Sequence, residues 1–190
     1  MDQGALDCSQ LPVDKALLRR ALGRFATGVM VVTTRTPDGR REGLTANSFS
    51  SVSLDPPLVL WSLRRDAPSL ESFIVAGRFA LSILGHGQSH LSRHFATPMA
   101  DKFAGIATRE GLGGCPVIDG CIAAFECSTE VVHEGGDHMI FIGRVERAEF
   151  RPGRPLVFAG GAYGSHEPLP EASPPRPAPS HLKLCQGAIS

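Results

Sequence analysis

One stretch, residues 43–65 (GLTANSFSSVSLDPPLVLWSLRR), constrains the fold of this chain more than any other. Two runs lie on either side of the turn Asp55-Pro56-Pro57, and runs bounded by such a turn predict two β-strands. The first run is unusual because hydroxyl and other small side chains fill it, whereas a solvated strand face more often carries Lys and Glu. Small donors let a planar ligand approach the backbone, so the stretch is typical of a wall of a small-molecule site.

The length and charge of the chain argue against several kinds of protein. Its 190 residues are enough for one domain with a hydrophobic core. Lys and Arg together number 19, as do Asp and Glu, so the chain lacks the positive charge that attracts nucleic acid or an anionic membrane. No apolar run approaches the roughly 20 residues that cross a bilayer. The acidic, polar N-terminus is unlike a secretory signal.

The cysteines indicate a reducing compartment. Their number is odd and no two have Cys-x-x-Cys spacing, a pattern that fits free thiols better than a disulfide framework or a zinc site. They are Cys8, Cys115, Cys121, Cys127 and Cys185. We therefore expect a cytoplasmic protein with no nucleic-acid or membrane partner.

Helical periodicity opens the ordered part of the chain. Apolar residues recur every four positions from Val13 to Phe25, with basic residues on the other face, which predicts a helix capped by Asp14 and ended by Gly28. Local signals also predict the elements that follow. These are strands at residues 29–34, 78–84, 122–132, 138–150 and 156–159, helices at 68–76 and 87–96, and turns at 36–39, 119–120 and 134–137.

Together these elements predict an all-β core of roughly six or seven strands with two or three helices. Strands joined by short turns indicate antiparallel pairing, and closure into a barrel would leave no bare edge. We expect one domain over residues 13–166, after a mobile N-terminus at residues 1–12. The Pro-rich tail at residues 167–190 is expected to be disordered.

Three histidines, His86, His90 and His94, are four residues apart in HGQSHLSRH. On one continuous helix they would share a face, and neutral imidazole nitrogens on one face can hold a metal. Gly85 and Gly87 place His86 in a loop instead, which breaks that face. We therefore favour a polar helix face over a metal site.

Two glycine-containing turns carry further candidate residues. His138 follows the turn at residues 135–137, from which it can point into a cleft and donate a hydrogen bond or a proton. A turn histidine in solvent fits the same spacing equally well. Tyr163 is the only tyrosine and lies within the glycine-rich residues 160–164, which allow a ligand to approach the backbone closely. An ordinary loop explains that spacing better when it is taken alone.

Other side chains have weaker signals. Trp61 at the end of a strand is more typical of a core than of a stacking platform. Surface arginines are common, so we expect at most half of the following cations to meet a phosphate. They are Arg64, Arg65, Arg93 and Lys102. The chain has no Rossmann, P-loop or nucleophile-elbow motif.

Six blocks in this order carry a more specific signal than any single motif. They are FATGV at residues 25–29, GLTANSFSSVSLDPPLVLWSL at 43–63, GRFALSIL at 77–84, DKF at 101–103, GDH and GRV within 136–145, and PLVF and GGAYG within 155–164. The set, over residues 14–166, resembles the flavin reductase family with the FMN-binding split-barrel fold. It is most similar to the small NAD(P)H:flavin oxidoreductase components of two-component flavin-dependent monooxygenases.

This resemblance implies a homodimer that binds a flavin, FAD or FMN, in a groove beside a split barrel and near the subunit interface. The residues that it implies at the flavin are Thr45, Ala46, Asn47 and Ser48 at the ring, Ser51 and Val52 near the pyrimidine edge, Trp61, Ser62, Leu63 and Arg64 along the ribityl and phosphate part, Ser69 at the phosphate, and Phe95, Lys102 and Phe103 around the remainder of the nucleotide. It implies His138, as the catalytic candidate, and Tyr163 on the nicotinamide side.

The resemblance also implies the reaction. NADH or NADPH would give a hydride to flavin N5, while the protein holds the two rings together and its donors favour the reduced flavin anion. The reduced flavin would then diffuse to a separate monooxygenase. Two alternatives are a non-catalytic flavin-binding module and another split-barrel enzyme, such as a pyridoxamine phosphate oxidase-like protein.

Overall fold

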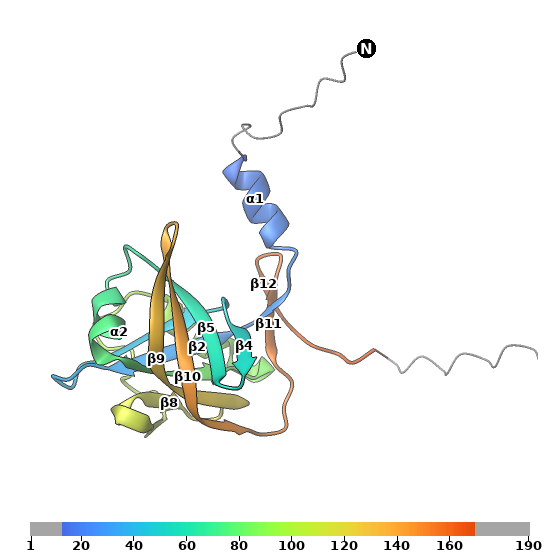
Figure 1. The fold of residues 1–190 in the computed structure, drawn as a ribbon. Helices are drawn as coiled ribbons and strands as arrows, with labels where there is room; N and C mark the ends of the chain where they lie inside the picture. Colours follow the sequence, from blue (N-terminus) through green and yellow to red (C-terminus); the bar gives the residue numbers. More distant parts are fainter. Residues whose placement is uncertain (1–12, 170–190) are drawn as a thin grey trace, which may run out of the picture.

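The computed structural model describes residues 13–169, which form a mostly β body with three short α-helices (Figure 1). The mobile segment predicted at residues 1–12 lies outside the described residues, as does the predicted disordered tail from residue 170 onward. The described residues contain twelve strands, more than the six or seven expected. The additional strands have only two to five residues each, too few to show a periodic pattern in the sequence.

Seven strands form one antiparallel sheet in the order β3-β2-β6-β9-β10-β5-β4. They are β2 (Met30–Arg35), β3 (Arg41–Ala46), β4 (Ser50–Leu54), β5 (Pro57–Arg64), β6 (Arg78–Ile83), β9 (Ala123–Gly135) and β10 (His138–Phe150). The long β9–β10 hairpin projects from the body in Figure 1. The two edge strands, β3 and β4, follow each other in the chain, with only Asn47, Ser48 and Phe49 between them.

Two smaller sheets complete the body. One joins β1 (Thr27–Gly28), β11 (Leu156–Ala159) and β12 (Ala162–Ser165), and the other pairs β7 (Thr108–Glu110) with β8 (Pro116–Ile118). The three-stranded sheet links the start of the domain to its end, because β1 pairs with β11 in antiparallel register.

The core is built by the alternation of side chains along the strands. On β5, Val59, Trp61 and Leu63 are buried, whereas Ser62 between them is only partly buried and belongs to the other face. Trp61 stacks on Phe141 of β10 with ring centroids 4.7 Å apart, and the Phe73 ring meets it edge-on at 5.0 Å. Aromatic pairs of this kind contribute roughly 0.5–1.5 kcal/mol beyond their burial.

The three helices differ in how they pack. Helix α2 (Leu70–Ala76) buries Phe73 and ends at Gly77, whose φ of 61° suits glycine. Helix α3 (Ser89–Ala96) buries Leu91 and Phe95 in a second core cluster. Helix α1 (Lys15–Leu22) buries no residue and stands outside the sheet body in Figure 1.

The structure confirms several predicted elements. Helix α2, strand β6, the β9–β10 hairpin and strand β11 lie where the sequence predicts them. The helix predicted at residues 87–96 is observed as α3, which begins two residues later at Ser89, because a 3₁₀ turn at His86–Gln88 precedes it.

Three predictions are wrong in detail. Helix α1 is capped by Asp14 as predicted but ends at Gly23, because the residues after it turn and Thr27–Gly28 pair with β11 instead. The first run of residues 43–65 is two strands, since the segment between β3 and β4 hydrogen-bonds to other parts of the chain. The turn at Asp119-Gly120 does not connect the two strands of a hairpin, because β8, which precedes it, pairs with β7 and not with β9.

Candidate functional site

The largest hollow that involves the predicted site residues is an open groove of about 670 Å³ beside β3 and β5. Small-molecule sites usually have volumes of about 300–1,000 Å³. Small, hydroxylated and apolar residues line most of it, and charged side chains lie at several points along it. The lining residues are Leu44, Thr45, Ala46, Asn47, Ser48, Ser62, Leu63, Arg64, Ala67, Pro68, Ser69, Phe95, Ala96, Lys102, Gly135, His138 and Ile140.

Strand β3 forms one wall because α3 packs closely against it. A Cβ atom at Gly43 would lie only 2.8 Å from Cε1 of Phe95, so a larger residue there would push the helix away. The Thr45 hydroxyl donates a hydrogen bond of 2.6 Å to the carbonyl oxygen of Ser92 in α3. The side chain of Thr45 is thereby fixed in orientation at the groove.

Ser48 ties the connection after β3 to the middle of β5. Its Oγ accepts a hydrogen bond of 2.9 Å from the Ser62 backbone N–H and donates one of 3.3 Å to the Ser62 carbonyl oxygen. Asn47 Nδ2 donates to the Thr27 hydroxyl at 3.2 Å. These contacts take residues 47 and 48 out of the strand ladder and hold them at the groove.

A smaller hollow of about 150 Å³ adjoins the groove and shares Thr45, Ala46 and Asn47 with it. Tyr163 of β12 lines it, and the Tyr163 hydroxyl lies 2.8 Å from the hydroxyl of Ser92. The structure thus brings Tyr163 beside the predicted ring-binding residues, although it is distant from them in the sequence.

Lys102 lies at the other end of the groove, in the loop after α3. Its ammonium donates hydrogen bonds to the carbonyl oxygens of Gly43 at 3.0 Å and Phe95 at 2.8 Å. Burial lowers the pKa of Lys102, and the nearby Glu42 carboxylate partly offsets this effect. Lys102 therefore brings positive charge to a place where most other lining groups are neutral.

Two more charged groups lie where the groove meets solvent. The Arg64 guanidinium binds both carboxylate oxygens of Asp66, at 2.9 and 2.6 Å, and remains 65% exposed. His138 Nδ1 lies 2.7 Å from Oδ1 of Asp137. That hydrogen bond, with the attraction between the two groups, lowers the pKa of Asp137. The same contact orients the imidazole ring at the groove.

The structure does not place every predicted site residue on the groove. The Trp61 ring is fully buried in the core, as the strand pattern favours, and Phe103 packs edge-on against Phe95 behind the wall. Ser51 and Val52 lie exposed on the edge strand β4. These four residues do not line the groove of the single chain.

Sequence reasoning missed Ser92, whose buried side chain and carbonyl oxygen bind Tyr163 and Thr45. The available signal was its position three residues before Phe95, on the packed face of α3. It also missed Ile140 and Gly135 of the β9–β10 hairpin, which no local motif connects to β3.

The histidines of residues 86–94, for which the sequence favours a polar helix face over a metal site, form no three-ligand cluster in the described residues. His94 Nε2 bonds the Lys102 carbonyl oxygen at 2.8 Å. Within residues 13–169, no group of three or more His, Cys, Asp or Glu side chains is arranged to hold a metal ion. The described cysteines, Cys115, Cys121 and Cys127, are free and buried, and burial raises the pKa of Cys127 to about 12.

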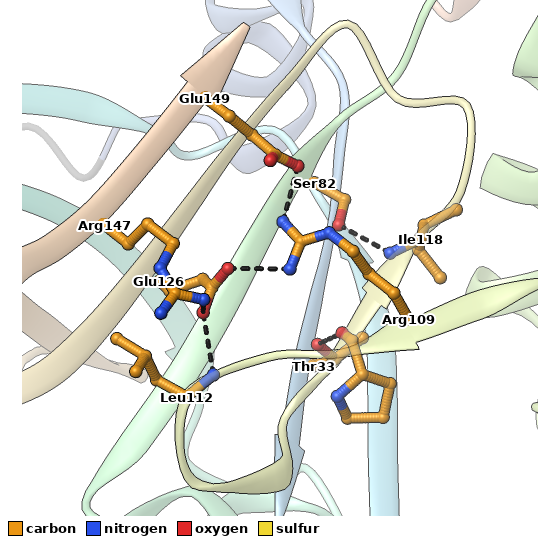
Figure 2. A network of polar contacts seen from close by, with 9 residues as sticks. Thr33, Ser82, Arg109, Leu112, Ile118, Glu126, Arg147 and Glu149 are labelled. Carbon is orange, nitrogen blue, oxygen red and sulfur yellow. Dashed lines mark hydrogen bonds and ion pairs between the residues drawn. The ribbon is translucent and has the colours of Figure 1, made fainter.

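A second polar cluster lies away from the groove (Figure 2). The Glu126 side chain, almost fully buried, accepts a hydrogen bond of 2.7 Å from the Leu112 N–H and pairs with Arg109 at 2.9 Å and Arg147 at 3.4 Å. Burial acts to raise its pKa, but these partners outweigh burial and hold the pKa of Glu126 below its ordinary value. All these partners come from the chain itself, so the cluster supports the fold.

No helix in the described part of the chain is long and apolar enough to span a membrane.

Comparison with known proteins matches residues 22–167 to the family described as the flavin reductase like domain. An FMN reductase (NADH), SmoA, of Agrobacterium fabrum is 47% identical over 77% of this chain and 83% of its own length. The reductase component of the flavin-dependent trigonelline monooxygenase of Acinetobacter baylyi is 44% identical over 77% of this chain. This chain covers 47% of that relative's length and 48% of that of another relative, from Rhizobium meliloti.

The fold of this chain also resembles that of a solved structure. It is the NADH:FAD oxidoreductase SgcE6 of Streptomyces globisporus C-1027, in complex with NAD and FAD fragments. The two chains are 40% identical and superpose with a TM-score of 0.77, over 87% of this chain and 100% of that one.

Proposed function

Since this chain belongs to the flavin reductase-like family, we propose that it is an NAD(P)H:flavin oxidoreductase whose groove beside β3 and β5 binds the flavin. The single observation that carries the proposal is the lining of this groove. Small residues, among them Thr45, Ala46 and Ser48, form one wall, and Lys102 lies at one end. This lining fits a flavin, because small side chains let a flat ring approach the backbone and a cation can meet the phosphate.

The bound flavin and nicotinamide supply the redox chemistry, in which a hydride passes from NADH or NADPH to the flavin. The chain has a binding and orienting role. Thr45, Ala46, Asn47 and Ser48 hold the ring system, Ser62, Leu63 and Arg64 follow the ribityl chain, and Ser69 and Lys102 meet the phosphate. Holding two reactants in contact geometry can supply much of the rate without a nucleophile.

His138 and Tyr163 are assigned to the nicotinamide side. His138 lines the groove from the β9–β10 hairpin and is already oriented by Asp137. Tyr163 lies at the adjoining hollow, with its hydroxyl fixed by Ser92. Trp61 and Phe103 would not contact the flavin directly; their buried rings would support the residues that line the groove. Ser51 and Val52 are proposed to reach a flavin only across a subunit interface, because they are exposed on an edge strand of the single chain.

The finer fold assignment is also proposed: the seven-stranded sheet is a split barrel. Adjacent strands lie about 4.8 Å apart, so the edges of a flat seven-stranded sheet would be about 29 Å apart. Only three residues join the edge strands β3 and β4, and four Cα–Cα steps span at most about 15 Å. Strong curvature of the sheet satisfies this short connection.

A homodimer is proposed on the basis of exposed apolar side chains. Leu17, Leu22 and Phe25, on and just after α1, are 54%, 64% and 76% exposed, and Leu54 on β4 is 95% exposed. Exposed apolar side chains concentrated on one segment, as at residues 17–25, commonly mark protein contacts. Light scattering after gel filtration should give twice the chain mass, and L17E/L22E should give a monomer. A wild-type monomer would contradict this assignment.

The proposed partner is a flavin-dependent monooxygenase that receives the reduced flavin. The open groove is consistent with a flavin that enters and leaves, as a diffusing carrier must. Free, buried thiols at Cys115, Cys121 and Cys127 support the expectation of a cytoplasmic protein.

Steady-state kinetics test the proposed function. The purified protein should oxidise NADH or NADPH only when FMN, FAD or riboflavin is added, at a rate proportional to the protein concentration. Flavin binding without nicotinamide oxidation would favour a non-catalytic flavin module. Tight binding of pyridoxal phosphate without flavin turnover would favour a pyridoxamine phosphate oxidase-like protein.

A further inference from the structure

A second hollow continues from the phosphate end of the groove. Its volume is about 400 Å³, and it shares Pro68, Ser69, Ala96 and Lys102 with the groove. Four common residues mean that one elongated molecule can occupy both spaces without leaving the surface. The two hollows therefore form one channel that bends at Ser69 and Lys102.

The lining of this second hollow differs from that of the groove. Pro98, Met99 and Ala100 give it an apolar side, and Met99 is 40% exposed there. Arg40 and Arg41 add two guanidinium groups, and the carboxylates of Glu42 and Asp101, which also line the hollow, lie 3.6 Å from Arg40 and 4.0 Å from Arg41 respectively. An apolar surface with guanidinium groups beside it suits a flat heteroaromatic base attached to a sugar phosphate.

Lys102 is the cation that both hollows share. Its two hydrogen bonds go to uncharged carbonyl oxygens, and within residues 13–169 it forms no ion pair with a carboxylate. An ammonium has three N–H donors, so one remains for another acceptor. Ser69 beside it has a hydroxyl that makes no capping hydrogen bond to α2. The junction thus offers a cation and a hydroxyl where the two hollows meet.

We propose that the hollow lined by Arg40, Arg41 and residues 98–102 binds the adenylate half of FAD, so that this chain prefers FAD to FMN. This inference rests on the proposed function. The flavin occupies the groove, the pyrophosphate crosses the junction at Ser69 and Lys102, and the adenosine covers the apolar side of the second hollow. FMN ends at the junction and leaves this hollow empty.

The adenylate of NAD(P)H has the same chemistry, but the position of the junction favours FAD. The hollow joins the groove at the residues assigned to the flavin phosphate. His138, Gly135 and Ile140, which line the part of the groove assigned to nicotinamide, are not among the shared residues.

Equilibrium binding tests the proposal without any turnover. Quenching of flavin fluorescence should give a Kd for FAD about tenfold below that for FMN, equivalent to about 1.4 kcal/mol. Ala100→Trp fills the second hollow and should weaken FAD binding about tenfold while the Kd for FMN stays within about twofold. Ala104→Trp is the matched control, because Ala104 is exposed on the same loop but lines neither hollow.

Arg40→Gln gives a second variant that removes charge with little change in size. It should raise the Kd for FAD several-fold and leave that for FMN unchanged. Equal affinities of the wild type for FAD and FMN would overturn the proposal. So would a rise in the KM for NADH in Ala100→Trp, with FMN as acceptor and an unchanged Kd for FAD, since the hollow would then belong to the nicotinamide donor. Because binding is read directly, a protein that binds FAD in this way but fails to oxidise NADH would contradict only the proposed function.

Discussion

The Glu126 cluster and the groove beside β3 and β5 differ in where their charged side chains lie. Around Glu126, one carboxylate is buried, and it meets partners of opposite charge from the same chain that themselves reach solvent (Figure 2). Along the groove, hydroxyl and backbone groups lie inside, while Arg64 and His138 stand where the groove meets solvent, 65% and 40% exposed.

The difference separates a structural role from a binding role. A buried carboxylate left without its partners would be costly, so a complete set of partners fixes the local structure. A groove that must admit a ligand cannot contain such a set, because its groups must exchange water for the ligand. The Glu126 cluster is therefore expected to govern stability, and the groove to govern flavin and nicotinamide affinity.

Removal of the Glu126 carboxylate should have the largest effect on the free energy of unfolding. Glu126→Ala leaves the Leu112 N–H and Arg147 without this acceptor, and leaves Arg109 with Glu149 as its one carboxylate partner. We expect a loss of about 3 kcal/mol, near the lower end for broken buried pairs because both arginines keep access to water. Urea unfolding would measure it, and kcat/KM per folded molecule should be unchanged. Glu149→Ala, which removes only a half-exposed partner of Arg109, should cost under about 1 kcal/mol.

Acid should weaken the same cluster. The pKa of Glu126 is lower in the folded protein than its ordinary value of about 4.3, so its contribution is present above that pH and is lost as the pH falls through the lower folded value. Urea unfolding from pH 7 to pH 3 should show the stability difference between wild type and Glu126→Gln shrinking at acid pH. A difference that stays constant would show that the carboxylate charge contributes nothing.

In the groove, His138→Ala should change turnover rather than stability. Without the imidazole that Asp137 orients, kcat/KM for NADH should fall about tenfold, or about 1.4 kcal/mol of transition-state stabilisation. The Kd for flavin should stay nearly constant. His133→Ala on the neighbouring strand β9 is the control, because that histidine is exposed and does not line the groove. Equal losses in both variants would remove His138 from the site.

The smallest effect is expected at Ser48. Ser48→Ala removes the hydrogen bonds to Ser62 and should cost about 1 kcal/mol of stability. It should also raise the Kd for flavin a few-fold, because the groove wall loosens. Ser53→Ala on β4 should change neither quantity. An unchanged flavin Kd in Ser48→Ala would mean that this contact supports only the fold.

Much of this arrangement can be predicted from local sequence. Short-range rules place the end of α2 at Gly77 and the turn between β9 and β10, because these depend on residues adjacent in the chain. The small donors of residues 43–53 also mark one groove wall before any tertiary contact is known.

The rest depends on contacts between distant residues. The break between β3 and β4 arises from bonds to Thr27 and Ser62, and the contact of Ser92 with Tyr163 joins residues 71 positions apart. Trp61 shows the same limit: its place on β5 favours a buried ring, but its packing against Phe73 and Phe141, which come from other elements, could not be predicted.

The most direct test of the groove's role is a single-turnover measurement without oxygen. The purified protein is mixed with FAD and NADH, and the visible absorbance of oxidised flavin is followed. We expect this absorbance to be lost at a rate that saturates with NADH, and we expect His138→Ala to slow the loss while Glu149→Ala does not. Flavin that binds in the groove but stays oxidised in the presence of NADH and NADPH would contradict this expectation.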